Sequence, residues 1–405
     1  MTAHPWRYGL LGLPLAFVAL PLFVSLPAHY AREHGVALGL LGLLLLAARC
    51  VDALADPWIG RFTDRWLRRR RVGPVLIGAA GVMALAFAGL FFPPGLQGTP
   101  LLAWAGVLLV LGYLAYSVLM ISHQAWGARL GGNPMQQTRL VAWREGLALA
   151  GVLVASVLTS QGAWGLTAAL LVAGLALGLW QLLGQPLPGP VEGQAAPRWS
   201  LAWRTPGFRR LLAVYAMNGI AAAVPATLLL FFVRDRLQAP DWEAAFLLTY
   251  FCAAAAALPL WLRAVARWGQ ARAWALGMVL ALLGFSGAAF LGSGDRLAFL
   301  LICAVTGAAA GADLAIPGAM LTRVIQRAGL AGRAEGAFFG WWTATTKLNL
   351  ALAAGLALPL LQALGYQEGL RTAESLRALS FTYALLPCAL KVLALTLLWR
   401  TPETA

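Results

Sequence analysis

The sequence predicts an all-α, polytopic membrane protein with twelve transmembrane helices in two bundles of six. The composition, a series of long apolar stretches and one polar connection midway along the chain together predict this class. Of the 405 residues, 60% are hydrophobic and only 11% are charged, and the mean hydropathy is +0.75. Soluble domains carry about 25% charged residues, so most of the surface of this chain must face lipid.

Twelve stretches are apolar enough to cross a bilayer, which requires about 20 mainly apolar residues per helix. Glycine and proline interrupt many of them, which membrane helices tolerate because neighbouring helices satisfy the freed backbone groups. The predicted spans are 10–31, 36–59, 73–93, 100–121, 139–160, 164–184, 208–232, 244–262, 271–292, 296–320, 336–364 and 378–400.

The basic residues predict the orientation of these spans. Of the 30 lysines and arginines, 21 fall on one side of the predicted membrane, six fall on the other, and Arg49, Lys347 and Lys391 lie inside spans. Because cytoplasmic connections carry the excess of basic residues, both termini are expected in the cytoplasm. The predicted location is the inner (plasma) membrane of the cell. The net charge of +15 is therefore a topology signal. Membrane lipid and a small molecule are the expected partners, and nucleic acid is not.

The longest polar connection divides the chain into two halves. Residues 185–207 are rich in proline, glycine and glutamine and separate six predicted spans from six. We expect an N-terminal six-helix bundle over 1–184, a cytoplasmic linker over 185–207 and a C-terminal six-helix bundle over 208–405. This layout resembles that of major facilitator transporters, in which the solute site lies between the halves. A monomer is the expected state.

Two acidic residues lie in the second predicted span. Asp52 and Asp56 are four residues apart, which puts both carboxylates on one helix face, and Arg49 shares that face. Each charge at membrane depth costs about 2.5–3.5 kcal/mol on insertion scales. Two carboxylates this close cannot both ionise cheaply, so they need a cation, a proton or a basic side chain. The pair therefore predicts a functional site, with the cation, the proton and the basic side chain all open as the partner of Asp52 and Asp56.

A second motif follows directly. From Gly60 the chain reads G-x-x-x-D-R-x-x-R-R-R, with Asp64 and Arg65 at its centre. The pattern resembles the signature between the second and third spans of major facilitator transporters, and the six-plus-six layout agrees with that fold. Physically it is a tight, basic two-helix connection, in which Gly60 permits close helix approach and Asp64 can pair with arginine or cap a helix. Gly60, Asp64 and Arg65 are expected to serve as a gate or hinge.

Further residues resemble one branch of that superfamily, the glycoside–pentoside–hexuronide:cation symporters. The pattern of an arginine followed by D-A-x-x-D-P matches residues 49–57, and Lys347 in the eleventh span matches a family lysine. The resemblance implies that Asp52 and Asp56 bind the coupling Na⁺, H⁺ or Li⁺ and that Ser117 supplies a hydroxyl ligand. It also matches Arg144 to an arginine that starts the fifth span.

The resemblance implies a sugar or glycoside as the solute. It places sugar contacts at Trp342 and Thr343, and an indole face can stack on a sugar ring. Trp341, Asn218 and Tyr116 are further candidates for substrate contact. The chain departs from the family where the first span, residues 13–20, has no acid and where Met120 replaces an acid of the fourth span, so the resemblance does not imply galactoside recognition.

These residues suggest a charge switch. With the cation site empty, Lys347 and Arg49 would neutralise the aspartates, and Arg144 belongs to the same coupling network. Binding of Na⁺ or H⁺ would release that lock, and cation and solute would raise each other's affinity, as linkage requires. The predicted function is cation-coupled symport of a small polar solute by alternating access, with the coupling ion and no other cofactor.

Two alternative functions share some of these features. A membrane prenyltransferase would need a second acidic cluster, whereas Asp313 is the single acid inside the spans of the C-terminal half, so the chain is not expected to be an enzyme. A proton-coupled exporter of drugs or metabolites on the same fold stays open.

Three further polar residues lie in or beside the predicted spans. Asp313 is expected either to line the solute cavity or to pair with Lys391. Lys391 is expected to reach the cytoplasmic surface, and His123 is expected at a helix end.

Overall fold

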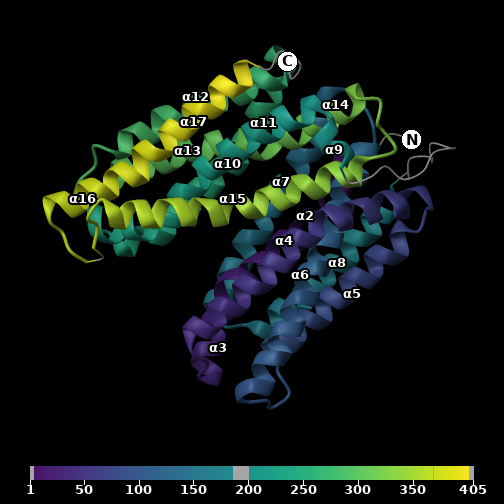
Figure 1. Ribbon diagram of the computed structural model, residues 1–405, viewed down its shortest axis with the longest axis horizontal. Helices are drawn as coiled ribbons and strands as arrows, with labels where there is room; N and C mark the ends of the chain where they lie inside the picture. The colour runs from purple at the N-terminus through teal and green to yellow at the C-terminus, as the bar shows by residue number, and fades with distance from the viewer. Residues whose placement is uncertain (1–3, 186–199, 368, 401–405) are drawn as a thin grey trace. The chain divides into compact units, whose positions relative to one another are not determined.

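The computed structural model describes residues 4–185, 200–367 and 369–400, and these residues form helices and no strand. The predicted all-α class is therefore confirmed (Figure 1). Most of the predicted linker, residues 186–199, lies outside the described residues. The chain folds into two compact units: unit 1 comprises residues 1–204 and 325–344, and unit 2 comprises residues 205–324 and 345–405.

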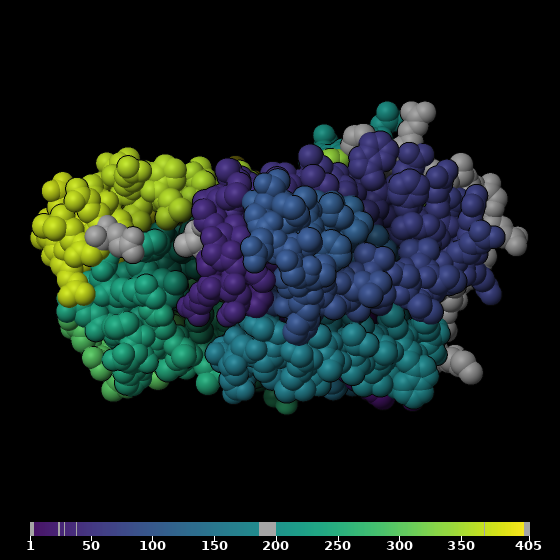
Figure 2. Space-filling model, turned by 90° about the horizontal axis from the view of Figure 1, so that it is seen from below, coloured from purple at the N-terminus to yellow at the C-terminus, as the bar shows by residue number. Residues whose placement is uncertain are grey.

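Unit 1 is a bundle in which α5, α6 and α8 lie side by side (Figure 1), with α2 packed on α7 and α4 packed on α6. Its helices, coloured purple to teal, form a closely packed surface in the space-filling view (Figure 2). The elements are α1 (Pro5–Gly9), α2 (Gly12–Leu20), the π-helical η1 (Pro21–Ser25), α3 (Leu26–His34), α4 (Leu38–Arg68), α5 (Val72–Phe91), α6 (Gly98–Arg129), α7 (Pro134–Ser160), α8 (Trp164–Leu183) and α9 (Leu201–Arg204).

Unit 2 packs α11 on α13, α10 on α17 and α12 on both α13 and α17. The elements are α10 (Pro206–Phe231), the π-helical η2 (Phe232–Arg236), the 3-10 helix η3 (Pro240–Trp242), α11 (Glu243–Trp268), α12 (Gln270–Ala288), α13 (Arg296–Ala315), α14 (Pro317–Arg327), α15 (Glu335–Ala363), α16 (Ala373–Ser380), the π-helical η4 (Phe381–Leu385) and α17 (Leu386–Trp399). Helices α14 and α15 belong partly to unit 1, which contains residues 325–344.

Among the described residues, ten helices are long and apolar enough to cross a membrane, and they coincide with the third to twelfth predicted spans. The first predicted span is divided among α2, η1 and α3, and most of the second lies in α4. Many large apolar side chains remain outside the core, including Leu54, Leu85 and Phe290, which are 75%, 74% and 86% exposed. An apolar surface of this extent requires a lipid solvent.

Helix α4 is longer than predicted. It runs without a break through Arg68, so Gly60, Asp64 and Arg65 are helical and the true connection is only Arg69–Arg71. The prediction ended the helix where the apolar residues ended. Arginine and leucine are good helix formers in water as well, and Pro57 inside α4 removes a single hydrogen bond without stopping the helix.

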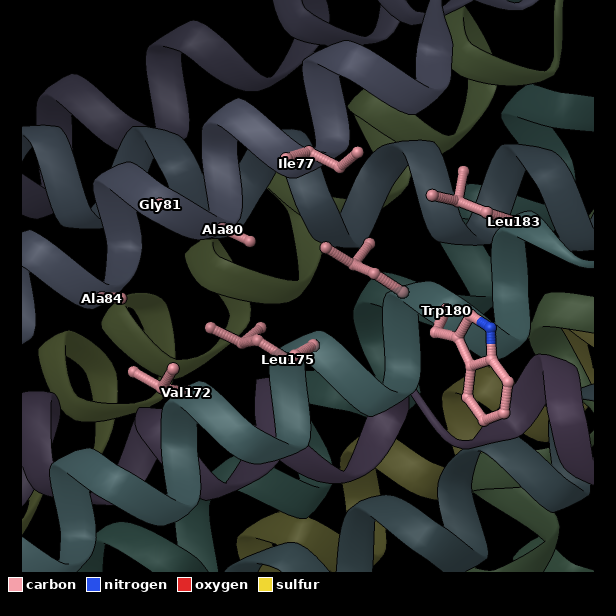
Figure 3. Close-up of a pocket in the computed structure, with 10 residues that line it drawn as sticks. Ile77, Ala80, Gly81, Ala84, Val172, Leu175, Trp180 and Leu183 are labelled. Carbon is pink, nitrogen blue, oxygen red and sulfur yellow. The ribbon is translucent and has the colours of Figure 1, made fainter.

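A shallow apolar groove lies on unit 1 between α5 and α8. Figure 3 shows Ile77 and Ala80 on one side and Val172, Leu175 and Trp180 on the other. Ile77, Val172 and Trp180 are more than half exposed. The lining carries no hydroxyl or charged group among the described residues.

Candidate functional site

The predicted acid pair is buried in unit 1. Asp52 is 4% exposed and Asp56 is 0% exposed, and both lie on the middle of α4. The hydroxyl of Ser117, on the adjacent helix α6, donates a hydrogen bond of 2.6 Å to Oδ1 of Asp52. The structure thus brings together the three residues that were predicted to hold the cation. Carboxylate and hydroxyl oxygens are the hard ligands that Na⁺ prefers.

The backbone beside this acid pair offers one more oxygen. Pro57 follows Asp56 inside α4 and has no N–H, so the carbonyl oxygen of Ala53 loses its helical donor. Ala53 lies between the two aspartates in sequence. An oxygen atom without its helical partner, next to two carboxylates, can serve a bound cation as a further ligand.

Polar side chains of α6 and α7 surround the acid pair. Arg49 and Asp52 both interact with Tyr113, and Tyr116 lies in the electrostatic field of Asp52, Asp56, Arg144 and Glu145. Nε of Arg144 donates to Glu145 at 3.0 Å. The sequence interpretation missed Glu145, although an acid directly after Arg144 in an apolar span was a visible signal.

Arg144 is held in place by close packing of α1 and α2 on α7. A Cβ atom at Gly12 would lie 2.7 Å from the carbonyl oxygen of Arg144, and one at Gly9 would lie 2.9 Å from its amide nitrogen. Helix α7 starts with a capping box, in which Asn133 and Gln136 accept each other's backbone N–H. The capping box fixes the residue at which α7 begins, and the close packing of α1 and α2 fixes the position of the backbone at Arg144.

A second buried cluster lies in unit 1, near the C-terminal end of α4. We call Asp64, Arg129 and Glu335 the gate cluster; they are 1%, 8% and 2% exposed. Nη2 of Arg129 is 3.1 Å from Asp64 Oδ1, and its Nε is 2.9 Å from Glu335 Oε2. Asp64 also accepts hydrogen bonds from the amides of Gly336 at 2.8 Å and Ala337 at 2.9 Å. Asp64 thus caps the positive N-terminus of α15.

Three glycines allow the backbones of α4 and the start of α15 to touch. A Cβ atom at Gly60 would collide with the carbonyl oxygen of Gly336, and a Cβ atom at Gly340 would lie 2.6 Å from the carbonyl oxygen of Asp56. The expected close approach at Gly60 is therefore present.

Arg65 is not part of the gate cluster: it is exposed, with its guanidinium 5.9 Å from the ring of Phe62. Arg129 takes the place expected of a loop arginine, because its helix runs alongside α4.

Three candidate substrate residues of α15 also belong to unit 1: Trp341, Trp342 and Thr343. Trp342 and Thr343 are 5% and 6% exposed, and Thr343 lies 3.3 Å from the side chain of Gln124. Trp341 packs edge-on against Trp203 of α9 at 5.1 Å between ring centroids. Trp342 and Thr343 therefore lie deeper in the unit than Trp341.

Unit 2 has its own buried charges, which we call the polar centre of unit 2. Nζ of Lys391 donates to Asn218 Oδ1 at 2.7 Å and to Asp313 Oδ2 at 3.1 Å, and the indole N–H of Trp274 donates to Asp313 Oδ1 at 2.7 Å. These residues join α10, α12, α13 and α17. The prediction that Lys391 reaches the cytoplasmic surface is wrong: the residue is 3% exposed, because a nearby carboxylate and amide satisfy its ammonium.

The remaining candidates are placed as follows. Lys347 belongs to unit 2, where the preceding residue Thr346 shares a hydrogen bond of 2.8 Å with Tyr215. His123 is fully buried, and its Nε2 lies 2.8 Å from the carbonyl oxygen of Tyr8. The expectation that His123 ends a helix is wrong, because α6 continues to Arg129.

Substitution of Lys391 by methionine should strongly destabilise the protein. Breaking one side of a buried ion pair costs about 3–5 kcal/mol, and the lower end applies because the Asp313 side chain is 19% exposed. We expect the double variant Asp313→Asn with Lys391→Met to recover most of that loss. Thermal unfolding of the purified protein in detergent measures both effects. A single variant as stable as the wild type would contradict the pairing.

A bundle of apolar spanning helices with carboxylates, hydroxyls and basic groups buried inside it defines the class of multi-pass membrane transporters. The chain matches the family described as MFS/sugar transport protein over residues 7–405. It therefore belongs to that family, whose members are transporters of small molecules and not enzymes.

Curated relatives match part of the chain. The inner membrane symporter YicJ of Escherichia coli K12 is 33% identical over 136 residues, which are 32% of this chain and 28% of the relative. A protein of the same organism named as a glycoside/cation symporter, YagG, is 28% identical over 150 residues, which are 37% of this chain and 33% of the relative. The matched segments thus span about a third of each relative's length. The predicted resemblance to cation symporters is confirmed.

Solved structures show the same fold over nearly the whole chain. A bacterial homologue of the iron transporter ferroportin in an outward-facing state superposes with a TM-score of 0.72 at 15% identity, covering 98% of both chains. The E. coli fucose:proton symporter FucP gives a TM-score of 0.67 at 14% identity, covering 96% of this chain and 98% of the other. The predicted major facilitator fold is therefore confirmed.

Proposed function

We propose that the protein is a symporter of the inner membrane that couples the uptake of a sugar or glycoside to the entry of Na⁺ or H⁺. The hydrogen bond between Ser117 and Asp52, one helical turn from the buried Asp56, is the observation that carries the proposal. The names of the relatives YagG and YicJ, a glycoside/cation symporter and a symporter, support it.

The acid pair is the coupling site. Protonation of one carboxylate, or one Na⁺ shared by Asp52, Asp56, Ser117 and the carbonyl of Ala53, removes the cost of two adjacent negative charges. Arg49, three residues before Asp52 on α4, is the basic group of unit 1 that neutralises the pair in the absence of a cation. Arg144 donates a hydrogen bond to Glu145, and its charge acts on Tyr116 together with the charges of Asp52 and Asp56. Arg144 is therefore the proposed coupling residue, and Tyr116 is a candidate solute contact.

The gate cluster is the device that closes one side of the solute pathway. Asp64 holds the start of α15 through two backbone amides and Arg129. Trp342, Thr343 and Trp341 follow on the same helix, so movement at the gate repositions the residues proposed to contact the solute. Gating of this kind is one part of alternating access in such transporters.

The basic residues of the predicted connections favour a cytoplasmic location for both termini, and the proposed working unit is a monomer. In this orientation the gate cluster lies on the cytoplasmic side of α4. The acid pair lies closer to the membrane centre, where coupling ions bind in such transporters.

Purified protein in sealed vesicles should accumulate a sugar or glycoside when an inward Na⁺ or H⁺ gradient is imposed. A panel of hexoses and their methyl glycosides is the probe set, and radiolabel or mass spectrometry measures the internal concentration. We expect accumulation above the external concentration with one of the two gradients, and its loss when an ionophore dissipates that gradient. Movement of solutes solely outward from the cytoplasmic face would contradict the proposal and favour the exporter alternative.

A further inference from the structure

The apolar groove between α5 and α8 of unit 1 has a buried floor and an exposed side. Ala80, Leu175 and Leu179 are buried and form the floor. Trp180 stands at the side and is exposed. On α5, Gly81 adds no side chain to the lining, and a Cβ atom there would meet nothing within 4 Å. The groove is thus a defined channel along two helices, open toward the surface of the unit.

The length of the groove corresponds to one leaflet of a membrane. On α8 the lining runs from Val172 to Leu183, the last residue of that helix, which is about 16 Å at 1.5 Å per residue. Half of a hydrocarbon core of about 30 Å is about 15 Å. A cavity of about 150 Å³ holds one benzene ring, so a groove of about 370 Å³ holds roughly 15 carbon atoms. These dimensions fit one acyl chain of a phospholipid.

One end of the groove lies beside a basic connection. A Cβ atom at Gly73 would lie 3.2 Å from Cδ2 of Leu183, so the start of α5 touches the end of α8. Figure 3 shows Leu183 and Trp180 together at this end, and Val172 toward the other end. The connection Arg69–Arg71 ends two residues before Gly73. The apolar groove therefore begins where the three arginines stand.

The charge of these arginines is not neutralised by neighbouring acids. Arg69, Arg70 and Arg71 are exposed, and none of them makes an ion pair within the part of the chain that the structure describes. The sequence has no acid between Asp64 and Glu145, and Asp64 is buried against the start of α15. An anion from outside the chain is the natural partner of three such charges.

Trp180 joins the apolar and the basic parts of this surface. It lies three residues before the end of α8, and its indole N–H has no hydrogen-bond partner among the described residues. Exposed tryptophans of membrane proteins gather at the level of the lipid head groups, where the ring packs on apolar chains and the N–H reaches a polar atom. The indole therefore indicates where the ester groups of a lipid would lie.

We infer that the groove and the three arginines form a binding site for one anionic diacyl phospholipid of the membrane. One acyl chain lies between α5 and α8, the indole of Trp180 meets the ester groups, and the phosphate accepts hydrogen bonds from Arg70 and Arg71. Guanidinium groups bind phosphate oxygens strongly and often in pairs.

The charge of the site favours a lipid over a second copy of the protein as the occupant. In the proposed orientation the arginines face the cytoplasmic leaflet, whose anionic lipids attract basic residues next to a spanning helix. A second copy of this chain, with a net charge of +15, would bring like charge to the same surface. The inference depends neither on the solute nor on the coupling ion.

Binding of two lipids with identical acyl chains tests the role of charge. The purified protein in detergent is titrated with phosphatidylglycerol or with phosphatidylethanolamine, and native mass spectrometry measures the fraction that keeps one lipid. We expect phosphatidylglycerol to bind at least about tenfold more tightly. The triple variant Arg69→Gln, Arg70→Gln, Arg71→Gln should bind the two lipids about equally. Equal binding of both lipids by the wild type would overturn the inference and mark a groove for acyl chains alone.

A second triple variant separates a defined site from general surface charge. Arg263→Gln, Arg267→Gln and Arg272→Gln remove the same charge from exposed positions of α11 and α12 in unit 2, on the same predicted side of the membrane. This control should keep the wild-type preference for phosphatidylglycerol. An equal loss of preference in both triple variants would show that net charge alone attracts the lipid, and it would overturn the inference.

Filling the groove tests the role of the acyl chain. Gly81→Phe puts a ring into the groove, whereas Gly78→Phe puts the same ring on α5 outside the lining. A Cβ atom at either glycine would meet nothing within 4 Å, so both variants should fold. We expect Gly81→Phe to weaken the binding of phosphatidylglycerol about tenfold and Gly78→Phe to leave it unchanged. Equal affinities in the two variants would show that no chain occupies the groove.

Glycerol 3-phosphate distinguishes a lipid from a soluble phosphate compound, because it has the charged group but no acyl chain. It should displace bound phosphatidylglycerol at concentrations at least about a hundredfold above those of a short-chain phosphatidylglycerol, since the chain contributes its buried apolar area. Displacement by the two compounds at similar concentrations would overturn the inference and mark the arginines as a site for soluble phosphates.

Discussion

Replacement of Asp52 by asparagine should abolish cation-driven accumulation of the solute while leaving the protein folded. The asparagine amide has the shape of the carboxyl but carries no charge, and its oxygen can still accept the Ser117 hydrogen bond of 2.6 Å. The cation would lose its principal ligand, so it could no longer raise solute affinity. Ordinary coupling free energies correspond to a change in affinity of about 5- to 150-fold, and we expect a loss in that range.

Exchange of solute between equal concentrations on the two sides separates coupling from folding. The Asp52→Asn variant should still exchange solute without a gradient, and its internal concentration should not rise above the external one. Asp241→Asn, which changes an exposed acid of η3, is the matched control and should accumulate solute like the wild type. Full accumulation by Asp52→Asn would show that the acid pair is not the coupling site.

Gly60→Ala should have the second largest effect, because the backbones of α4 and α15 touch at this position. The new methyl group would collide with the carbonyl oxygen of Gly336 and push the start of α15 away from Asp64. The two amide hydrogen bonds to Asp64, at 2.8 Å and 2.9 Å, would lengthen. Hydrogen bonds to a charged group contribute about 1.5–3 kcal/mol each, so the closed gate would become unfavourable.

Initial uptake rates and thermal unfolding measure this effect. We expect uptake to fall about tenfold, which corresponds to about 1.4 kcal/mol, and the unfolding midpoint to fall by about 5 °C. Gly42→Ala is the matched control on the same helix, because a Cβ atom there meets nothing within 4 Å. Alanine is also the better helix former by about 1 kcal/mol, so that variant should be as stable as the wild type or more stable. Equal behaviour of the two variants would exclude a gate at Gly60.

The sequence was sufficient to predict features that depend on local chemistry. Hydropathy located the apolar helices, since a bilayer selects for length and composition alone. The spacing of Asp52 and Asp56 placed them on one face, and the family resemblance paired Asp52 with Ser117. Helix α4 was drawn too short, because the apolar pattern marks the membrane boundary and helical hydrogen bonding continues beyond it.

Features that depend on tertiary contact were not predictable. Arg129 is 65 positions from Asp64 and 206 positions from Glu335 in sequence, and neither spacing carries a signal. Lys391 was expected at the surface because a lysine near a helix end usually reaches water. Its burial follows from Asn218 and Asp313 on two other helices. The unit 2 pocket that Phe246, Tyr250 and Tyr383 help to line likewise assembles from five separate elements.

Ion movement caused by the solute alone tests the central proposal most directly. Vesicles containing the protein are equilibrated with no ion gradient, a transported glycoside is added outside, and a pH electrode or a Na⁺-sensitive dye records the response. The proposal predicts that adding the glycoside drives H⁺ or Na⁺ into the vesicles, and that Asp52→Asn and Asp56→Asn abolish this ion entry. Entry of the glycoside with no accompanying ion, or ion entry unchanged in both variants, would contradict it.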